Sequence, residues 1–297
     1  MPTLSDRIAL IDGDIITYCA GFASDQREYH VLDSAGRTLS KHKYKKDAVD
    51  AFAITFNART IEKRVTPEPW GFCRHSVDML MNAIIQDTEC DDHHVFLSPK
   101  GESSFRYKLA TTQPYKGNRI AAHKPLHYKA IRRHLINQWG ARFHYKYEAD
   151  DLLAAEAVSL NRVGEEPVIC TLDKDLDTIS GLHYNWKRKK EKFQFISETA
   201  AMVNFYTQVL TGDRADNIPG LQGIGQKRAW NILAACKTET ELYEACHNAY
   251  TARGLDSQYA EILSLLFIQR HRDFSTSSFT LNVFVPPHAR EHLTGYW

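Results

Sequence analysis

Four clusters of acidic residues, followed by a glycine-rich segment, constrain this chain more than any other feature. Carboxylates that share a site repel one another, so a fold that gathers several of them needs compensating cations. Hard divalent ions such as Mg²⁺ or Mn²⁺ suit a site made only of oxygen ligands. The clusters are Asp12-Gly13-Asp14, Glu148-Ala149-Asp150-Asp151, Asp173-Lys174-Asp175 and Asp213-Arg214-Ala215-Asp216.

The glycine-rich segment covers residues 218–229 and indicates a phosphate-binding site. Glycines allow a phosphate to approach the backbone closely, and this segment contains Gly220, Gly223 and Gly225. A helix that begins at Gln226, with Lys227 and Arg228 next to it, presents free N–H groups and a favourable dipole to the same anion.

The charge is strongly segregated along the chain, although the net charge is only +1. Residues 100–133 contain nine Lys or Arg and one acid, Glu102. A basic surface beside an acidic site is typical of an enzyme that acts on nucleic acid, because cations neutralise phosphates while the acids hold metal ions. A merely solvated basic loop is the alternative.

Composition places the chain among soluble globular proteins, with 43% hydrophobic and 25% charged residues in a length of 297. The six cysteines lie far apart without a C-x-x-C pair, a pattern typical of reduced thiols in the cytoplasm. We expect no targeting segment and no membrane anchor, because no apolar run approaches roughly 18 residues. The histidines, including His123 and His127, match no zinc pattern.

Apolar strand patterns alternate with helical patterns in the first two thirds of the chain. This alternation predicts an α/β fold with a mostly parallel sheet, in which ligands collect at the carboxyl ends of strands. Asp12 and Asp173 fall at such ends. The expected strands are 8–12, 94–97, 167–172 and 182–186, and the expected helices are 74–86, 125–139 and 149–161.

Two further regions have a different pattern. Residues 28–32 and 38–43 predict a β-hairpin in the first crossover. After residue 200 short helical patterns take over, so we expect one domain over 1–200, which includes the basic segment 100–133, and another over 201–297. The expected C-terminal elements are helices at 201–210, 226–236, 240–249 and 258–269, and a strand at 279–285.

Each acidic cluster also has a structural explanation. Acids at 148–151 would cap a helix, but three of them within four residues exceed what a cap requires. Asp173 and Asp175 would share one face of an extended segment, although aspartate is common in plain loops. Asp213 and Asp216 are three residues apart, which would point both carboxylates the same way on a helical turn.

Five motifs in this order resemble the 5′-nuclease family, which comprises flap endonucleases and 5′–3′ exonucleases. The resemblance covers about residues 8–235 and is closest to a compact, bacteriophage-type member. It rests on Ile11-Asp12-Gly13, Tyr115-Lys116-Gly117-Asn118-Arg119, Glu148-Ala149-Asp150-Asp151, Leu172-Asp173-Lys174-Asp175, and residues 211–220 with Gly223-Ile224-Gly225.

The resemblance implies a PIN-like nuclease core, a helix-three-turn-helix module that grips duplex DNA, and two-metal hydrolysis of phosphodiesters. The implied metal ligands are Asp12, Glu148, Asp150, Asp151, Asp173, Asp175, Asp213 and Asp216. Lys116 and Arg119 would act with Asp12, Asp150 and Asp173 in catalysis, clamping the scissile phosphate. The expected DNA contacts are Arg106, Lys108, Tyr115, Lys116, Arg119, Gly220, Gly223, Gly225, Lys227 and Arg228. The family also implies K⁺ at the glycine-rich loop and activity on RNA–DNA hybrids, and we expect a monomer.

One departure from the family pattern bears on catalysis. A further metal-proximal Asp is common after the strand that ends here at Leu97, and this chain has Ser98-Pro99 instead. Glu102 or Asp14 is a candidate to compensate for it. Two other functions therefore stay open: a DNA-binding homologue without activity, and a PIN-type ribonuclease acting on single-stranded RNA.

Overall fold

The computed structural model describes residues 7–119, 123–188, 190–270 and 286–287 of the chain. It divides into two compact units. The first unit contains residues 1–15, 83–122 and 135–297, and the second contains residues 16–82 and 123–134.

A six-stranded sheet forms the centre of the first unit, in the order β6-β5-β1-β7-β8-β9. The strands β6 to β8 in this order are parallel, and β9 pairs with β8 in the antiparallel sense. Parallel strands are buried on both faces, which explains why these segments read as continuous apolar runs. Their bounds are β1 (Arg7–Asp12), β5 (Asp92–Leu97), β6 (Arg142–Phe143), β7 (Glu166–Cys170), β8 (Gly181–Tyr184) and β9 (Phe193–Ile196).

Helix α6 (Ala149–Arg162) buries its apolar face against this sheet. Leu153 and Ala154 of the helix pack in one cluster with Leu10 of β1 and Ile169 of β7, all fully or almost fully buried. Because α6 starts level with the carboxyl ends of β1 and β7, its first turn is placed beside the residues that follow those strands. The short α4 (Phe105–Leu109) and the 3₁₀ helix η1 (Asp175–Thr178) complete this region.

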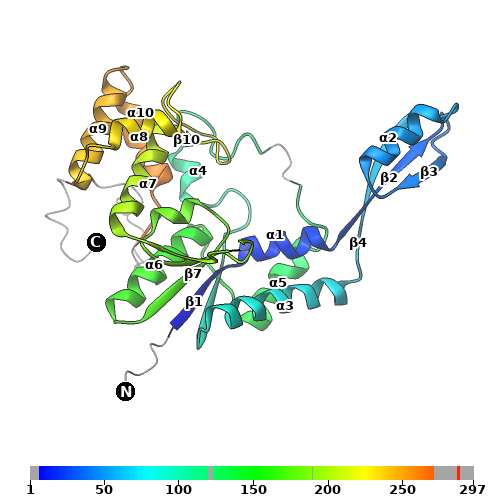
Figure 1. Cartoon of the computed structure of the whole chain (residues 1–297), viewed down its shortest axis with the longest axis horizontal. Coiled ribbons are helices and arrows are strands. Elements are labelled where there is room, and N and C mark those ends of the chain that lie inside the picture. Colours follow the sequence, from blue (N-terminus) through cyan, green and yellow to red (C-terminus); the bar gives the residue numbers. More distant parts are fainter. Residues whose placement is uncertain (1–6, 120–122, 189, 271–285, 288–297) are drawn as a thin grey trace. The chain divides into compact units, whose positions relative to one another are not determined.

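The last helices of the chain form a second core within the first unit. They pack around buried tyrosines, Tyr206, Tyr250 and Tyr259. In Figure 1 they gather together in yellow-green to orange. The elements are α7 (Glu198–Thr211), β10 (Gly212–Asp213), β11 (Ile218–Pro219), α8 (Gln226–Leu233), α9 (Glu239–Thr251) and α10 (Asp256–Leu266).

A three-stranded antiparallel sheet, in the order β3-β2-β4, lies in the second unit. One helix, α2 (Lys45–Ile54), covers it, with Val31 and Ala48 fully buried between them. The strands are β2 (Asp25–Leu32), β3 (Thr38–His42) and β4 (Thr60–Pro67). Three helices have residues in both units: α1 (Gly13–Ala23), α3 (Trp70–Thr88) and α5 (Tyr128–Trp139).

The fold confirms the predicted α/β class with its mostly parallel sheet and C-terminal helices. The division of the chain differs from the expected one, because residues 201–270 belong to the same unit as the six-stranded sheet and the 16–82 segment is set apart. The sequence analysis did not predict α2 and β4. The strand expected at 279–285 lies outside the described residues, as do residues 120–122 of the basic segment.

Every cysteine is a free thiol. Among the described residues, no helix is long and apolar enough to cross a membrane.

Candidate active site

The acidic clusters converge at the carboxyl edge of the six-stranded sheet. Asp12 is the last residue of β1, Asp173 follows β7, and Asp150 lies in the first turn of α6. Two other acids, Asp213 and Asp216, come from β10 and the turn after it. Four segments that are far apart in the sequence therefore supply one group of carboxylates.

Asp12 is buried and held by hydrogen bonds on both oxygens. The backbone N–H groups of Asp14 and Ile15 donate to Oδ1, each at 3.1 Å, and Thr171 Oγ1 donates to Oδ2 at 3.0 Å. Burial, and then the charges of Asp14 and Asp173, raise the pKa of Asp12 to about 7. The position of the carboxylate is thus fixed, but its negative charge is unfavourable, as expected of a group that binds a cation.

Asp150 and Glu148 differ in their electrostatic surroundings although both belong to the start of α6. Burial, followed by the charges of Asp12 and Asp173, raises the pKa of Asp150 well above its usual range. Burial opposes ionisation of Glu148 too, but Lys116 and Arg106 more than offset it and lower its pKa. Asp150 therefore carries the larger uncompensated repulsion.

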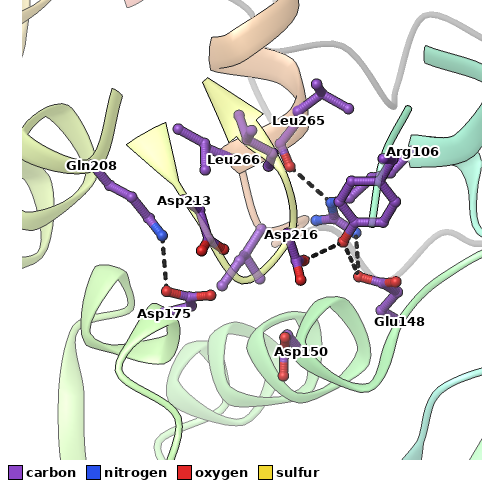
Figure 2. A pocket seen from close by; sticks show the side chains of 12 residues that line it. Arg106, Glu148, Asp150, Asp175, Gln208, Asp213, Asp216, Leu265 and Leu266 are labelled. Atoms are coloured by element: carbon purple, nitrogen blue, oxygen red, sulfur yellow. Dashed lines mark hydrogen bonds and ion pairs between the residues drawn. The ribbon is translucent and has the colours of Figure 1, made fainter. Parts of the chain in front are cut away.

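Asp175 connects the sheet edge to the hairpin formed by β10 and β11. Burial and the neighbouring acids Asp173, Asp213 and Asp216 raise its pKa to about 7. Gln208 of α7 donates to Asp175 Oδ1 at 2.8 Å and fixes its position. Figure 2 shows Asp150, Asp175, Asp213 and Asp216 around one cavity of about 30 Å³.

Two cations of the basic segment point at the acids. Lys116 Nζ lies 2.7 Å from Glu148 Oε1 and 3.5 Å from Asp216 Oδ2, and Arg119 forms an ion pair with Asp216 Oδ1. Burial lowers the pKa of Lys116, but the charges of Glu148 and Asp216 more than compensate and raise it. The ammonium group therefore stays charged beside the carboxylates.

The segment that carries these cations is attached to the hairpin through its backbone. Lys116 N–H donates to Asp216 O at 2.8 Å, and Asn217 Nδ2 donates to Pro114 O at 2.9 Å. Lys116 and Asn217 both have left-handed backbone conformations, with φ of 55° and 59°. Non-glycine residues in this region store strain, which proteins keep mainly at functional sites.

Arg106 and Asp151 occupy positions that contradict their expected roles. Arg106 Nη1 and Nη2 lie 2.7 and 2.8 Å from the two carboxylate oxygens of Asp151, and 4% of Arg106 and 0% of Asp151 are exposed. Asp151 also accepts the N–H of Glu148 and that of Gln269. Arg106 is thus a structural counter-ion rather than a DNA contact, and Asp151 is occupied as a helix cap and salt-bridge partner instead of a metal ligand.

We expect Arg106→Met to lower the free energy of unfolding by roughly 3–5 kcal/mol, because it leaves Asp151 buried and uncompensated. Urea unfolding measures the loss. In a double-mutant cycle with Asp151→Asn, the two losses should be non-additive by at least about 1 kcal/mol. If Asp151→Asn instead kept full stability and lost only metal affinity, Asp151 would be a ligand after all.

Tyr115 and Lys108 also differ from each other in what they can contact. Tyr115 is 4% exposed, and its hydroxyl lies 2.8 Å from Glu148 Oε2 and 2.6 Å from Asp216 Oδ2, so that it donates to one of these carboxylates. Its ring packs against Tyr107 in the helical core, so the expected DNA contact of Tyr115 is buried in this arrangement. Lys108 lies on the exposed side of α4.

The glycines of the 218–229 segment serve two different purposes. A Cβ on Gly220 would lie 2.2 Å from the backbone of Thr211, so chain packing by itself requires this glycine. Gly225, the N-cap of α8, has open space around it, whereas a Cβ on Gly223, with φ of 76°, would lie 3.4 Å from Arg228 Nη1, which donates to Gly223 O at 2.7 Å. Lys227 and Arg228 are exposed on the first turn of α8, where they remain available to an anion.

Asp14 is the better placed of the two acids considered as replacements near Ser98. Its Oδ2 accepts the N–H of Ser98 at 2.9 Å, and its charge helps to raise the pKa of Asp12. Ser98 Oγ in turn accepts the N–H of Ala149 at 3.0 Å. Glu102 is exposed, so Asp14 is the carboxylate that adds negative charge beside Asp12.

The donor set fits hard divalent ions in its chemistry. Its acids offer carboxylate oxygens, and burial, followed by mutual repulsion, raises the pKa of Asp12, Asp150 and Asp175. In the part of the chain that the structure describes, no three His, Cys, Asp or Glu side chains already form a closed metal-binding group.

Two positioning residues escaped the sequence interpretation. Thr171 holds Asp12, and Gln208 holds Asp175. Thr171 stands at the end of an apolar strand, which is a weak signal. Gln208 was more visible, because it is a polar residue within the apolar pattern of helix α7, between Val203 and Leu210.

DNA polymerases I are among the sequence relatives of this chain, and no protein-family profile matches it. The DNA polymerase I of Bacillus caldotenax is 27% identical over 176 residues, which are 52% of this chain and 19% of the polymerase. The thermostable DNA polymerase I of Thermus filiformis is 39% identical over 98 residues, or 30% of this chain and 11% of the polymerase. The matched part is thus about a fifth or less of each relative.

Solved structures share the fold at lower sequence identity. The T5 5′-exonuclease with bound divalent zinc ions superimposes with a TM-score of 0.53 and 15% identity, covering 88% of this chain and 89% of that one. The structure of the T5 D15 protein co-crystallised with metal ions gives the same values. At this identity the likeness establishes the fold alone.

Proposed function

We propose that this chain is a structure-specific 5′ nuclease, which hydrolyses DNA phosphodiesters from 5′ ends and at 5′ flaps with two divalent metal ions. The observation that carries the proposal is the convergence of Asp12, Asp150 and Asp173 at the sheet edge with Lys116 facing the same group of acids. The shared fold with a metal-binding T5 5′-exonuclease and the similarity to DNA polymerase I support it.

Two Mg²⁺ or Mn²⁺ ions would generate a hydroxide nucleophile and stabilise the charge that develops on the phosphodiester. Asp12, Asp150 and Asp173 would hold them, with Glu148, Asp175, Asp213 and Asp216 around them. Lys116 and Arg119 would bind the scissile phosphate and stabilise its added negative charge. Both cations lie on a segment attached to the hairpin of β10 and β11. This attachment would fix the position of the bound phosphate relative to the acids.

The start of helix α8 would hold the duplex part of the substrate. Gly223 and Gly225 leave room for a backbone phosphate, and Lys227 and Arg228 are exposed beside it. In this interpretation the six-stranded sheet with its helices is a PIN-like nuclease core, and α7 to α8 form a helix-three-turn-helix module. Bound K⁺ at this loop, activity on RNA–DNA hybrids, a monomeric state, a cytoplasmic location and a bacteriophage-type origin stay predictions.

The decisive experiment incubates the protein with 5′-labelled flap, nicked duplex and single-stranded DNA in Mg²⁺, Mn²⁺ or EDTA. We expect cleavage from the 5′ side in both metals and none in EDTA. Flap binding without cleavage in either metal would instead favour a DNA-binding homologue without activity and would point to Ser98 as the cause. Cleavage restricted to single-stranded RNA would favour a PIN-type ribonuclease.

A further inference from the structure

A dense basic segment lies in the second unit, outside the candidate active site. Residues 41–46 read Lys-His-Lys-Tyr-Lys-Lys, with four cations and no acid. They form the corner between the edge strand β3 and helix α2, and we call them the lysine corner. Within it, only His42 is partly buried; the lysines and Tyr44 are exposed.

The lysines of this corner contribute little to the stability of the fold. None of the four forms an ion pair with a described residue, although the charge of Lys41 is one of the causes that lower the pKa of Glu28. Lys45 and Lys46 occupy the first turn of α2, where positive charge is unfavourable to the helix dipole, and Asp47 is the one acid in that turn. Their charges are therefore available to an anionic partner outside the chain.

Tyr44 likewise has no structural use for its ring. Its side chain is 61% exposed, and it makes no capping hydrogen bond although it is the N-cap residue of α2. The ammonium of Lys43 lies 5.8 Å from the ring centre. An exposed aromatic ring among lysines combines base stacking with phosphate neutralisation, which is how proteins bind unpaired nucleic-acid strands.

A lipid surface fits this region less well. The large apolar side chains that α2 exposes are Val49 and Ile54, which are 46% and 86% exposed. They are five residues apart and therefore lie about 140° apart around the helix axis. A helix that rests on a membrane needs a single apolar face, and α2 does not have one.

We propose that the lysine corner binds unpaired, single-stranded nucleic acid, with Tyr44 stacking on a base and Lys41, Lys43, Lys45 and Lys46 contacting successive phosphates. The proposal depends on the proposed nuclease function in one respect only: that function identifies the bound polymer as a nucleic acid. It adds a second contact surface to the chain, in the three-stranded sheet unit, and that surface contains none of the candidate catalytic residues.

The test measures binding of the full-length chain to a fluorescein-labelled 20-nucleotide single strand and to a 20-base-pair duplex in EDTA, by anisotropy over a range of salt concentrations. We expect Tyr44→Ala to weaken single-strand binding roughly tenfold and to leave duplex binding unchanged. Tyr44→Phe keeps the ring and should retain the affinity. The triple variant Lys43→Gln/Lys45→Gln/Lys46→Gln should reduce the slope of log K against log salt by about 2, since each single-strand phosphate contact contributes about 0.7.

Lys63→Gln serves as the matched control, because Lys63 is an exposed lysine of the same small sheet and should leave both slopes unchanged. Single-strand binding that is unaffected by Tyr44→Ala and by the triple variant would overturn the proposal. Equal losses for the single strand and the duplex would overturn the stacking role of Tyr44. These variants should still cleave a flap, so a chain that cleaves but ignores the substitutions refutes the lysine corner and leaves the proposed nuclease function standing.

Discussion

Asp173→Asn should reduce cleavage of a 5′ flap by roughly a thousandfold while the affinity for the flap stays within a few fold. The carboxylate raises the pKa of Asp12, Asp150 and Asp175 alike, so it faces three other acids of the site. Loss of its charge would remove one ligand of the metal ions that these acids are proposed to hold together. Single-turnover cleavage in Mg²⁺, with anisotropy binding in EDTA alongside, measures the two quantities separately.

Asp177→Asn is the matched control for this change. Asp177 lies four residues further along the same segment and is partly buried, and burial is the main cause that raises its pKa. Unlike Asp173, it is not among the main causes that raise the pKa of Asp12, Asp150 or Asp175. Its replacement should leave the cleavage rate within about twofold of the unmodified chain. Equal losses in both variants would mean that the segment as a whole, and not the Asp173 carboxylate, determines activity.

Lys116→Met should abolish most flap cleavage and, at the same time, tighten the binding of Mn²⁺ by roughly tenfold. The ammonium lies 2.7 Å from Glu148 and 3.5 Å from Asp216, so it neutralises negative charge that would otherwise attract divalent ions. Methionine has a similar length without the charge. Calorimetric titration with Mn²⁺ in the absence of DNA reports the affinity independently of activity.

A second readout separates this effect from simple loss of structure. Without metal, Lys116→Met leaves two carboxylates facing each other, so its melting temperature should fall; added Mn²⁺ should restore most of the difference. Lys108→Met, an exposed lysine on α4, should change neither quantity. A weaker Mn²⁺ affinity in Lys116→Met would show that Lys116 supports the metal site instead of competing with it.

The sequence predicted the sheet and the position of the acids because both depend on local signals. Apolar runs gave β1, β5, β7 and β8, and the acids that follow β1 and β7 had to meet at the same edge of a parallel sheet. Helix α6 was predictable from its capping acids and its apolar spacing. The C-terminal helices were found from periodicity in the same way.

Sequence reasoning failed where the outcome depends on which partner a charge finds. Nothing local distinguishes Arg106 from Lys108, yet the first is buried against Asp151 and the second faces solvent. Asp151 looked like its neighbour Asp150, but it forms a buried ion pair with Arg106. The hairpin of β2 and β3 was expected, but α2 and β4, which complete the second unit with it, were not, so the sequence did not indicate that residues 16–82 form a separate unit.

The contact between Gly212 and Gly220 has a consequence for the tolerance of this chain to variation. A Cβ on Gly212 would lie 2.2 Å from the backbone nitrogen of Gly220, and Gly212 also has φ of 72°. The hairpin that carries Asp213 and Asp216 is therefore closed by two backbones that touch without side chains between them. In a saturation screen, these two codons should stand out as isolated positions that accept no replacement, within a turn where the exposed neighbours Arg214 and Ala215 accept most of them.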